Sequence, residues 1–190
     1  MKPNIAMNPP PESLEISGGI FCIRTDFRIW IQACELLQNL KSTSDEIFVK
    51  QLAELYELIF INEYPTDAPA ALKAITAFLQ GYPEQMTGKV QNGTQTLSLC
   101  EDINEIVLAI RNQSGLDLSY RCKYFHFWEF LLEVKTLEER HYISRIQQIR
   151  GYKGKDKDML RLKEQYALNS QPSENELIAA EELDELFYDS

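Results

Sequence analysis

The six residues Phe125-His126-Phe127-Trp128-Glu129-Phe130 decide the fold, because they gather four aromatics and one of the chain's two histidines. Aromatic side chains dominate the energetics of hydrophobic cores, so we expect this segment to be a helix near the centre of the protein. If Phe125 and Trp128, which are three residues apart, face the core, Phe127 and Phe130 point at least partly elsewhere. We interpret the segment as a helix buried on two sides. In an alternative interpretation, Phe127, Trp128 and Phe130, together with His126, form a groove for an apolar partner helix.

Hydrophobic residues recur at helical spacing on both sides of this segment. Asp26 is a predicted N-cap for a helix through Lys41, and Ser44 opens the next helix. Asp67 caps a third helix, which we expect to end near Gly81. These boundaries predict three helices in the first 81 residues.

Two capping boxes predict further helices in the second half of the chain. Ser98-x-x-Glu101 precedes a helix that stops at Gly115, and Thr136-x-x-Glu139 opens a helix that continues to Arg150 and stops at Gly151. A short charged helix is expected over residues 155–168. The aromatic segment lies between the two capping boxes.

The β-strand pattern is confined to the N-terminal region, where residues 14–16 and 21–23 flank the turn Ser17-Gly18-Gly19. The predicted fold class is therefore mainly α, a helical bundle with a short N-terminal β-hairpin. We expect a disordered leader over residues 1–12, which contains three consecutive prolines, and a single helical domain over 13–168. Residues 82–97 are expected to form a long mobile loop, and residues 169–190 an acidic amphipathic tail.

Charge is distributed unevenly along this chain, whose net charge is -10. Residues 1–120 carry 8 basic and 15 acidic groups, residues 121–170 carry 11 and 7, and the last twenty carry 7 acidic groups and no basic one. A nucleic-acid-binding protein is not expected, because contacts with phosphates need clustered positive charge. The acidic tail is interpreted either as a solubilising appendage or as a segment that folds back on the basic region.

Targeting and membrane signals are not evident in the sequence. We find neither an apolar run long enough to span a membrane nor the pattern of a signal peptide, so we expect a cytoplasmic location. The four cysteines are not arranged as pairs, which favours reduced and mostly buried thiols over disulfides or a zinc site.

A catalytic site is only weakly indicated. His126 could share a helix face with Cys122 or Glu129, which would suit a cytoplasmic enzyme, but no nucleophile signature or phosphate-binding glycine loop accompanies them. A metal site needs three or four ligands, and no second half-site is present. We therefore expect no metal, no cofactor and no small-molecule substrate. His141 stands alone and is interpreted as a surface residue.

Several short motifs resemble, in order, the bacteriophage gene-product-fifteen (Gp15) family of tail proteins from long-tailed phages and prophages of Gram-positive bacteria. The matching segments are Thr25-Asp26-Phe27-Arg28-Ile29-Trp30, Glu101-Asp102-Ile103 to Gly115-Leu116-Asp117-Leu118, the aromatic segment, Ile149-Arg150, and Leu162-Lys163 to Tyr166-Ala167-Leu168. The resemblance covers about residues 14–168. The chain departs from the family where Phe127 replaces a tryptophan and Glu129 replaces a lysine.

This resemblance implies a non-enzymatic chaperone in the host cytoplasm. Such a chaperone would bind the tape measure protein through apolar contacts and help to recruit the tail tube protein. On this interpretation His126, Phe127, Trp128 and Phe130 are the candidate partner-binding residues. Self-association remains open. The alternatives are a structural component of the tail or its connector and, third, the enzyme that uses His126.

Overall fold

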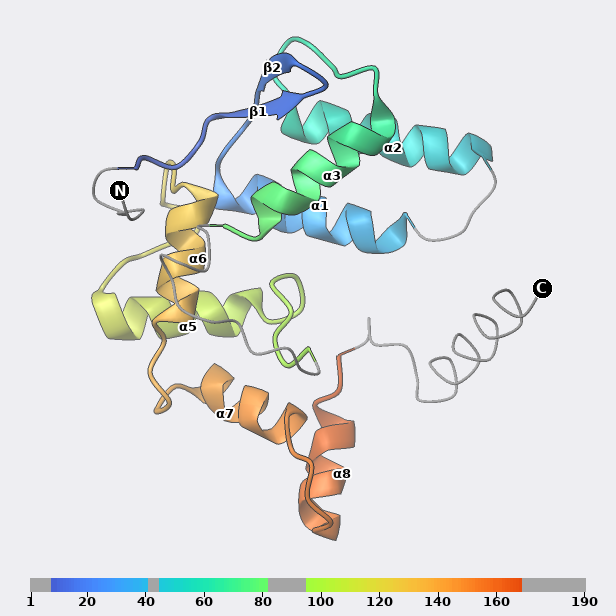
Figure 1. Cartoon of the computed structure of the whole chain (residues 1–190). Helices are drawn as coiled ribbons and strands as arrows, with labels where there is room; N and C mark the ends of the chain where they lie inside the picture. The colour runs from blue at the N-terminus through green and yellow to red at the C-terminus, as the bar shows by residue number, and fades with distance from the viewer. Residues whose placement is uncertain (1–7, 41–44, 82–94, 169–190) are drawn as a thin grey trace, which may run out of the picture.

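The computed structural model describes residues 8–40, 45–81 and 95–168, and this part of the chain is mainly helical (Figure 1). Its elements are β1 (Ser13–Ile16), β2 (Gly19–Cys22), α1 (Phe27–Asn39), α2 (Asp45–Ile59), α3 (Ala68–Leu79), α5 (Ile103–Ser114), α6 (Phe127–Lys135), α7 (Tyr142–Arg150) and α8 (Lys157–Gln165). The predicted mainly-α fold with a short N-terminal hairpin is confirmed. The predicted cap Ser44, most of the expected 82–97 loop and the acidic tail lie outside the described residues.

The helices follow one another along the length of the molecule (Figure 1). The hairpin and α1, α2 and α3 occupy one end, α5 and α6 lie in the middle, and α7 and α8 form the opposite end. Helix α1 packs against both α2 and α6, α5 packs against α6 and α7, and α7 packs against α8. Contact between α1 and α6 therefore connects the two halves of the sequence.

The hairpin is supported by α3 rather than standing alone. Strands β1 and β2 pair antiparallel from Ser13–Cys22 to Ile16–Gly19, and the turn places Ser17 and Gly18 at positive φ. Leu14 and Ile16 of β1 are buried, and β1 packs against α3. Ser17 Oγ also donates to Asp67 Oδ2 at the start of α3, at 2.7 Å. An isolated two-stranded hairpin is marginally stable, so these contacts explain its persistence.

Several predicted helix ends are confirmed. Asp26 and Asp67 are the N-caps of α1 and α3, and the side chain of each accepts a hydrogen bond from a backbone N–H in the first turn. Gly81 and Gly115 follow α3 and α5 with φ of 72° and 76°. This left-handed conformation favours glycine and ends a helix.

Two predicted helix starts are wrong. Ser98 Oγ does accept from the N–H of Glu101, but the carboxylate that accepts from the Ser98 N–H belongs to Asp102, and α5 begins only after it. Thr136 does not open a helix; it is the C-cap of α6, and its hydroxyl donates to the carbonyl of Glu133. Helix α7 begins six residues later, at Tyr142.

Candidate functional site

The N-termini of α1 and α6 meet at the centre of the protein. Asp26, the N-cap of α1, and His126, the N-cap of α6, face each other in an antiparallel β-bridge. The residue after each cap donates to the residue before the other: Phe27 N to Phe125 O at 2.9 Å, and Phe127 N to Thr25 O at 2.8 Å. Two helix starts from opposite halves of the sequence are thus fixed to each other by their backbones.

Asp26 and Arg28 reinforce this junction. The Arg28 guanidinium contacts both carboxylate oxygens of Asp26 at 2.7 Å, and it donates to the carbonyls of Cys122 and Lys123. Asp26 also accepts from the Phe125 N–H at 3.2 Å. Partial burial raises the pKa of Asp26, but the hydrogen bonds from Arg28 and Phe125 outweigh it, so the pKa lies below its usual value. Arg28 thereby holds the segment that leads into α6.

Aromatic rings pack directly beneath the junction. The ring pairs, by centroid distance, are Trp30–Phe78 at 4.1 Å, Phe27–Phe130 at 4.8 Å, Phe78–Trp128 at 5.4 Å and Trp30–Phe127 at 5.8 Å. They come from α1, α3 and α6. The Trp128 indole N–H also donates to the Phe78 carbonyl at 2.9 Å, near the end of α3. This aromatic cluster is the central core of the fold.

The core-facing side of the aromatic segment carries Phe127 and Phe130. Phe127 and Phe130 are 0% exposed, whereas Phe125 and Trp128 are only partly buried. Phe125 and His126 precede α6 instead of lying on it. The side of α6 that faces the core therefore cannot be read from the spacing of Phe125 and Trp128. Of the four candidate partner-binding residues, Trp128 keeps appreciable exposed surface, and partner binding by this segment stays a prediction.

His126 has a structural position in the described fold. Its Nδ1 accepts from the Trp128 N–H at 3.0 Å, so Nε2 carries the proton of the neutral ring and faces the Pro11 carbonyl at 3.2 Å. Burial lowers the pKa of His126 below its usual value, although the Pro11 carbonyl and the charges of Glu129 and Glu12 act in the opposite direction. Residues 11 and 12 of the expected leader also bond to the body, because the Glu12 carbonyl accepts from Ile23.

The cysteines and the second histidine differ from expectation. All four thiols are free, but Cys22 is exposed and the other three are only partly buried. Cys122 precedes α6, so it shares no helix face with His126. His141 is buried rather than on the surface, and its Nε2 lies 3.1 Å from Gln113 Oε1 of α5. Gln113 is therefore a link between α5 and the segment that enters α7.

A buried ion pair joins the two ends of the second half of the chain. Arg150, the last residue of α7, contacts both carboxylate oxygens of Asp102, the N-cap of α5, at 2.6 and 2.9 Å. Arg150 also donates to the carbonyls of Tyr166, after α8, and Thr96, before α5. The paired side chains are 10% and 6% exposed, so this contact is shielded from solvent.

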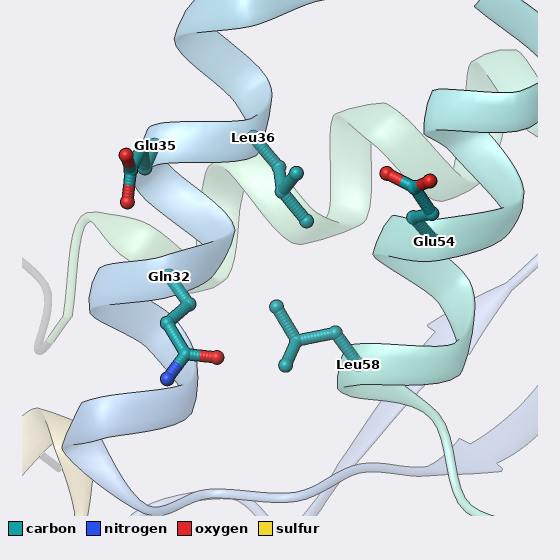
Figure 2. A pocket seen from close by; sticks show the side chains of 5 residues that line it. All are labelled: Gln32, Glu35, Leu36, Glu54 and Leu58. Carbon is teal, nitrogen blue, oxygen red and sulfur yellow. The ribbon is translucent and has the colours of Figure 1, made fainter.

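A pocket of about 370 Å³ lies between α1 and α2 (Figure 2). Gln32, Glu35 and Leu36 line it from α1, and Glu54 and Leu58 line it from α2. The two leucines are partly buried and point into the space between the helices (Figure 2). Glu35 and Glu54 are both exposed; the Glu54 side chain points toward this space, and the Glu35 carboxylate lies on the side of α1 turned away from α2. The pocket therefore combines an apolar floor with an acidic rim.

Helix α8 presents the opposite charge at the other end of the molecule (Figure 1). None of its residues is buried. Leu160 is 40% exposed, and Lys157 and Arg161 are exposed as well. Lys163, in contrast, donates to the Tyr152 carbonyl and is tied to the preceding loop.

Comparison with known proteins identifies the family. The model of the family described as "Bacteriophage Gp15 protein" matches residues 8–168, most of the chain. The chain belongs to the bacteriophage Gp15 family. No curated protein and no solved structure gives a significant match. Within the described ranges, no group of three His, Cys, Asp or Glu side chains is placed to hold a metal ion, and no helix has the length and apolar composition to cross a bilayer.

The motifs that resembled the Gp15 family come together in the fold. The segment around Asp26 and the segment around His126 form the helix junction, while Arg150 binds Asp102 and the Tyr166 carbonyl. The α1–α2 pocket of this Gp15-family chain was not expected from the sequence. Leu36 and Leu58 carried no distinguishing signal, because several other apolar residues of the same two helices enter the core.

Proposed function

We propose that this Gp15-family protein is a non-enzymatic chaperone of phage or prophage tail assembly. It would bind the tape measure protein in the host cytoplasm and help to recruit tail tube subunits. The single observation that carries the proposal is the family match over residues 8–168. A tail chaperone fits this mostly helical, acidic chain, since weak contacts repeated along a long client give reversible coating.

The position of His126 favours the non-enzymatic proposal over the enzyme alternative. Both ring nitrogens face backbone groups, and the residue is 3% exposed. A general base must reach the substrate proton through a free nitrogen. His126 would have to give up its N-cap bond or its contact with Pro11 to do so.

The proposal is tested by co-expression with the tape measure protein of the same phage genome. We expect the two proteins to co-purify and the soluble fraction of the client to rise, compared with co-expression of an unrelated acidic helical protein. Unchanged client solubility together with no recovered complex would refute chaperone activity.

Mass spectrometry of purified virions separates the chaperone from the structural alternative. A chaperone is released before the tail is complete, so we expect its peptides to be absent while tail tube peptides are abundant. Recovery at a fixed ratio to the tail tube protein would instead identify a structural component of the tail or its connector.

A further inference from the structure

The two ends of the described molecule carry complementary surfaces. Helices α1 and α2 together contain two basic and five acidic residues, and the pocket between them is rimmed by Glu35 and Glu54. Residues 153–163, which include most of α8, contain five basic and two acidic residues. Figure 1 places α8 at the end opposite α1 and α2, so the two surfaces of one molecule do not contact each other.

The pocket can hold an apolar side chain, and its acidic lining residues favour a basic helix. Its volume of about 370 Å³ is framed by Leu36 and Leu58, whose partly exposed side chains face each other across the gap (Figure 2). Covering these carbons removes apolar surface from water, which favours association. Lysine or arginine beside the inserted side chain would lie near Glu35 and Glu54.

The exposed face of α8 has this arrangement. Leu160 projects from the helix at 40% exposure, with Lys157 one turn before it, and Arg161 follows Lys157 at the i+4 position. No residue of α8 is buried, so the helix retains surface for a partner. Glu164, one turn beyond Leu160, is also its neighbour and reduces the positive charge of this face.

We propose that α8 of one copy docks in the α1–α2 pocket of a second copy. Leu160 would enter between Leu36 and Leu58, while Lys157 and Arg161 approach Glu35 and Glu54. The contact is heterologous, since a groove on one copy meets a helix on the next, so repetition produces rings or open chains rather than a closed twofold dimer. The acidic 169–190 segment is a poor occupant of this pocket, because its seven acidic residues would repel the acidic rim.

The proposal is tested by reversing charge on each surface separately in the full chain. Glu35→Lys/Glu54→Lys alters the pocket, and Lys157→Glu/Arg161→Glu alters the helix; all four side chains are exposed, so folding should be retained and is checked by circular dichroism. Glu15→Lys/Glu139→Lys makes the same charge change as the pocket variant at exposed positions elsewhere. Molar mass is measured by light scattering over a concentration series at low and high salt.

We expect the unmodified protein to gain mass with concentration at low salt and to lose it at high salt. Each reversal should weaken association by about tenfold or more, while the Glu15/Glu139 control stays like the unmodified protein. An equimolar mixture of the pocket variant and the helix variant should associate again. In the mixture, the pocket of each variant can bind α8 of the other variant, which carries the opposite charge.

Three results would overturn the proposal. The first is a monomer at every concentration, and the second is association that neither reversal weakens. The third is a mixture of the two variants that fails to regain mass. If the protein is monomeric but the pocket variant alone loses the tape measure protein, the pocket serves a basic client segment instead of a second copy.

Discussion

Arg150 binds both carboxylate oxygens of Asp102 in a buried ion pair, at 2.6 and 2.9 Å. The pair joins the last residue of α7 to the N-cap of α5, and the same guanidinium holds the carbonyls of Tyr166 and Thr96. One side chain therefore connects four separate parts of the second half of the chain. Removing it leaves a carboxylate that burial prevents from regaining water.

Arg150→Ala is expected to lower the free energy of unfolding by about 3–5 kcal/mol, because Asp102 remains as an unpaired buried charge. Arg150→Lys should recover only part of this loss, since an ammonium cannot make the same planar two-bond contact. Urea unfolding followed by circular dichroism measures both. The matched control is Arg140→Ala, whose pair with Glu138 is exposed (67% and 55%), with an expected cost of about 0–1 kcal/mol. Equal losses at Arg140 and Arg150 would contradict this assignment.

Phe127→Ala is expected to destabilise the protein by about 3–5 kcal/mol, because it opens a cavity beneath Trp30 and Phe78. Tyr120→Ala is the exposed aromatic control: Tyr120 is 85% exposed, and its loss should change stability by about 0.5 kcal/mol or less. Thermal and urea unfolding measure the difference. A well-tolerated Phe127→Ala would argue against the aromatic cluster as the central core.

Asp26→Ala should cost more stability than Asp67→Ala, although both remove a helix N-cap. Asp67 is exposed, so loss of its cap and of its bond from Ser17 Oγ is expected to cost the smaller amount. Asp26→Ala also removes the partner of Arg28 and an acceptor for the Phe125 N–H, which raises the expected cost to about 2–4 kcal/mol. The comparison uses urea midpoints at neutral pH. The opposite order would contradict the importance of the α1–α6 junction.

His126 is expected to make stability fall on mild acidification. Its pKa is lowered in the folded protein, so the unfolded chain takes up the proton first. The stability that neutral His126 contributes is therefore complete above the usual histidine pKa, near 6.5, and is lost as pH falls through the lower value of the folded state. Urea midpoints measured from about pH 7.5 to about pH 5 give this slope.

His126→Asn is the matched variant for this measurement. Asparagine is a good N-cap and can still accept from the Trp128 N–H, but it does not titrate. The slope across the histidine range should therefore decrease in the variant. Parallel curves for the two proteins would show that His126 is not the source of the pH dependence.

Helix ends were predicted correctly where they depend on residues that are neighbours in the sequence. Asp26 and Asp67 cap as expected, and Gly81 and Gly115 end their helices, because capping and left-handed turns depend on neighbouring residues. The start of α6 could not be found in this way. Its position depends on the pairing of residues 125–127 with 25–27, a contact whose partners are distant in sequence.

Contacts between residues that are distant in sequence also explain the errors in the candidate site. His141 looked isolated because its partner, Gln113, lies 28 positions earlier. Asp102 took the role expected of Glu101 because Arg150 and the Ser98 N–H both approach its carboxylate. The α1–α2 pocket depends on how two helices are spaced, which the apolar pattern of either helix alone does not specify.

The bridge between Asp26 and His126 affects how the chain folds during its synthesis. Asp26 and Phe125 are 99 positions apart, so α1 can emerge from the ribosome long before the residues that cover it. Phe27 and Trp30 lack the rings of Phe130 and Phe127 until those residues have been translated. A chain released early would expose an aromatic face, and such faces promote aggregation and degradation. Truncated products should therefore be removed before they can compete with complete molecules.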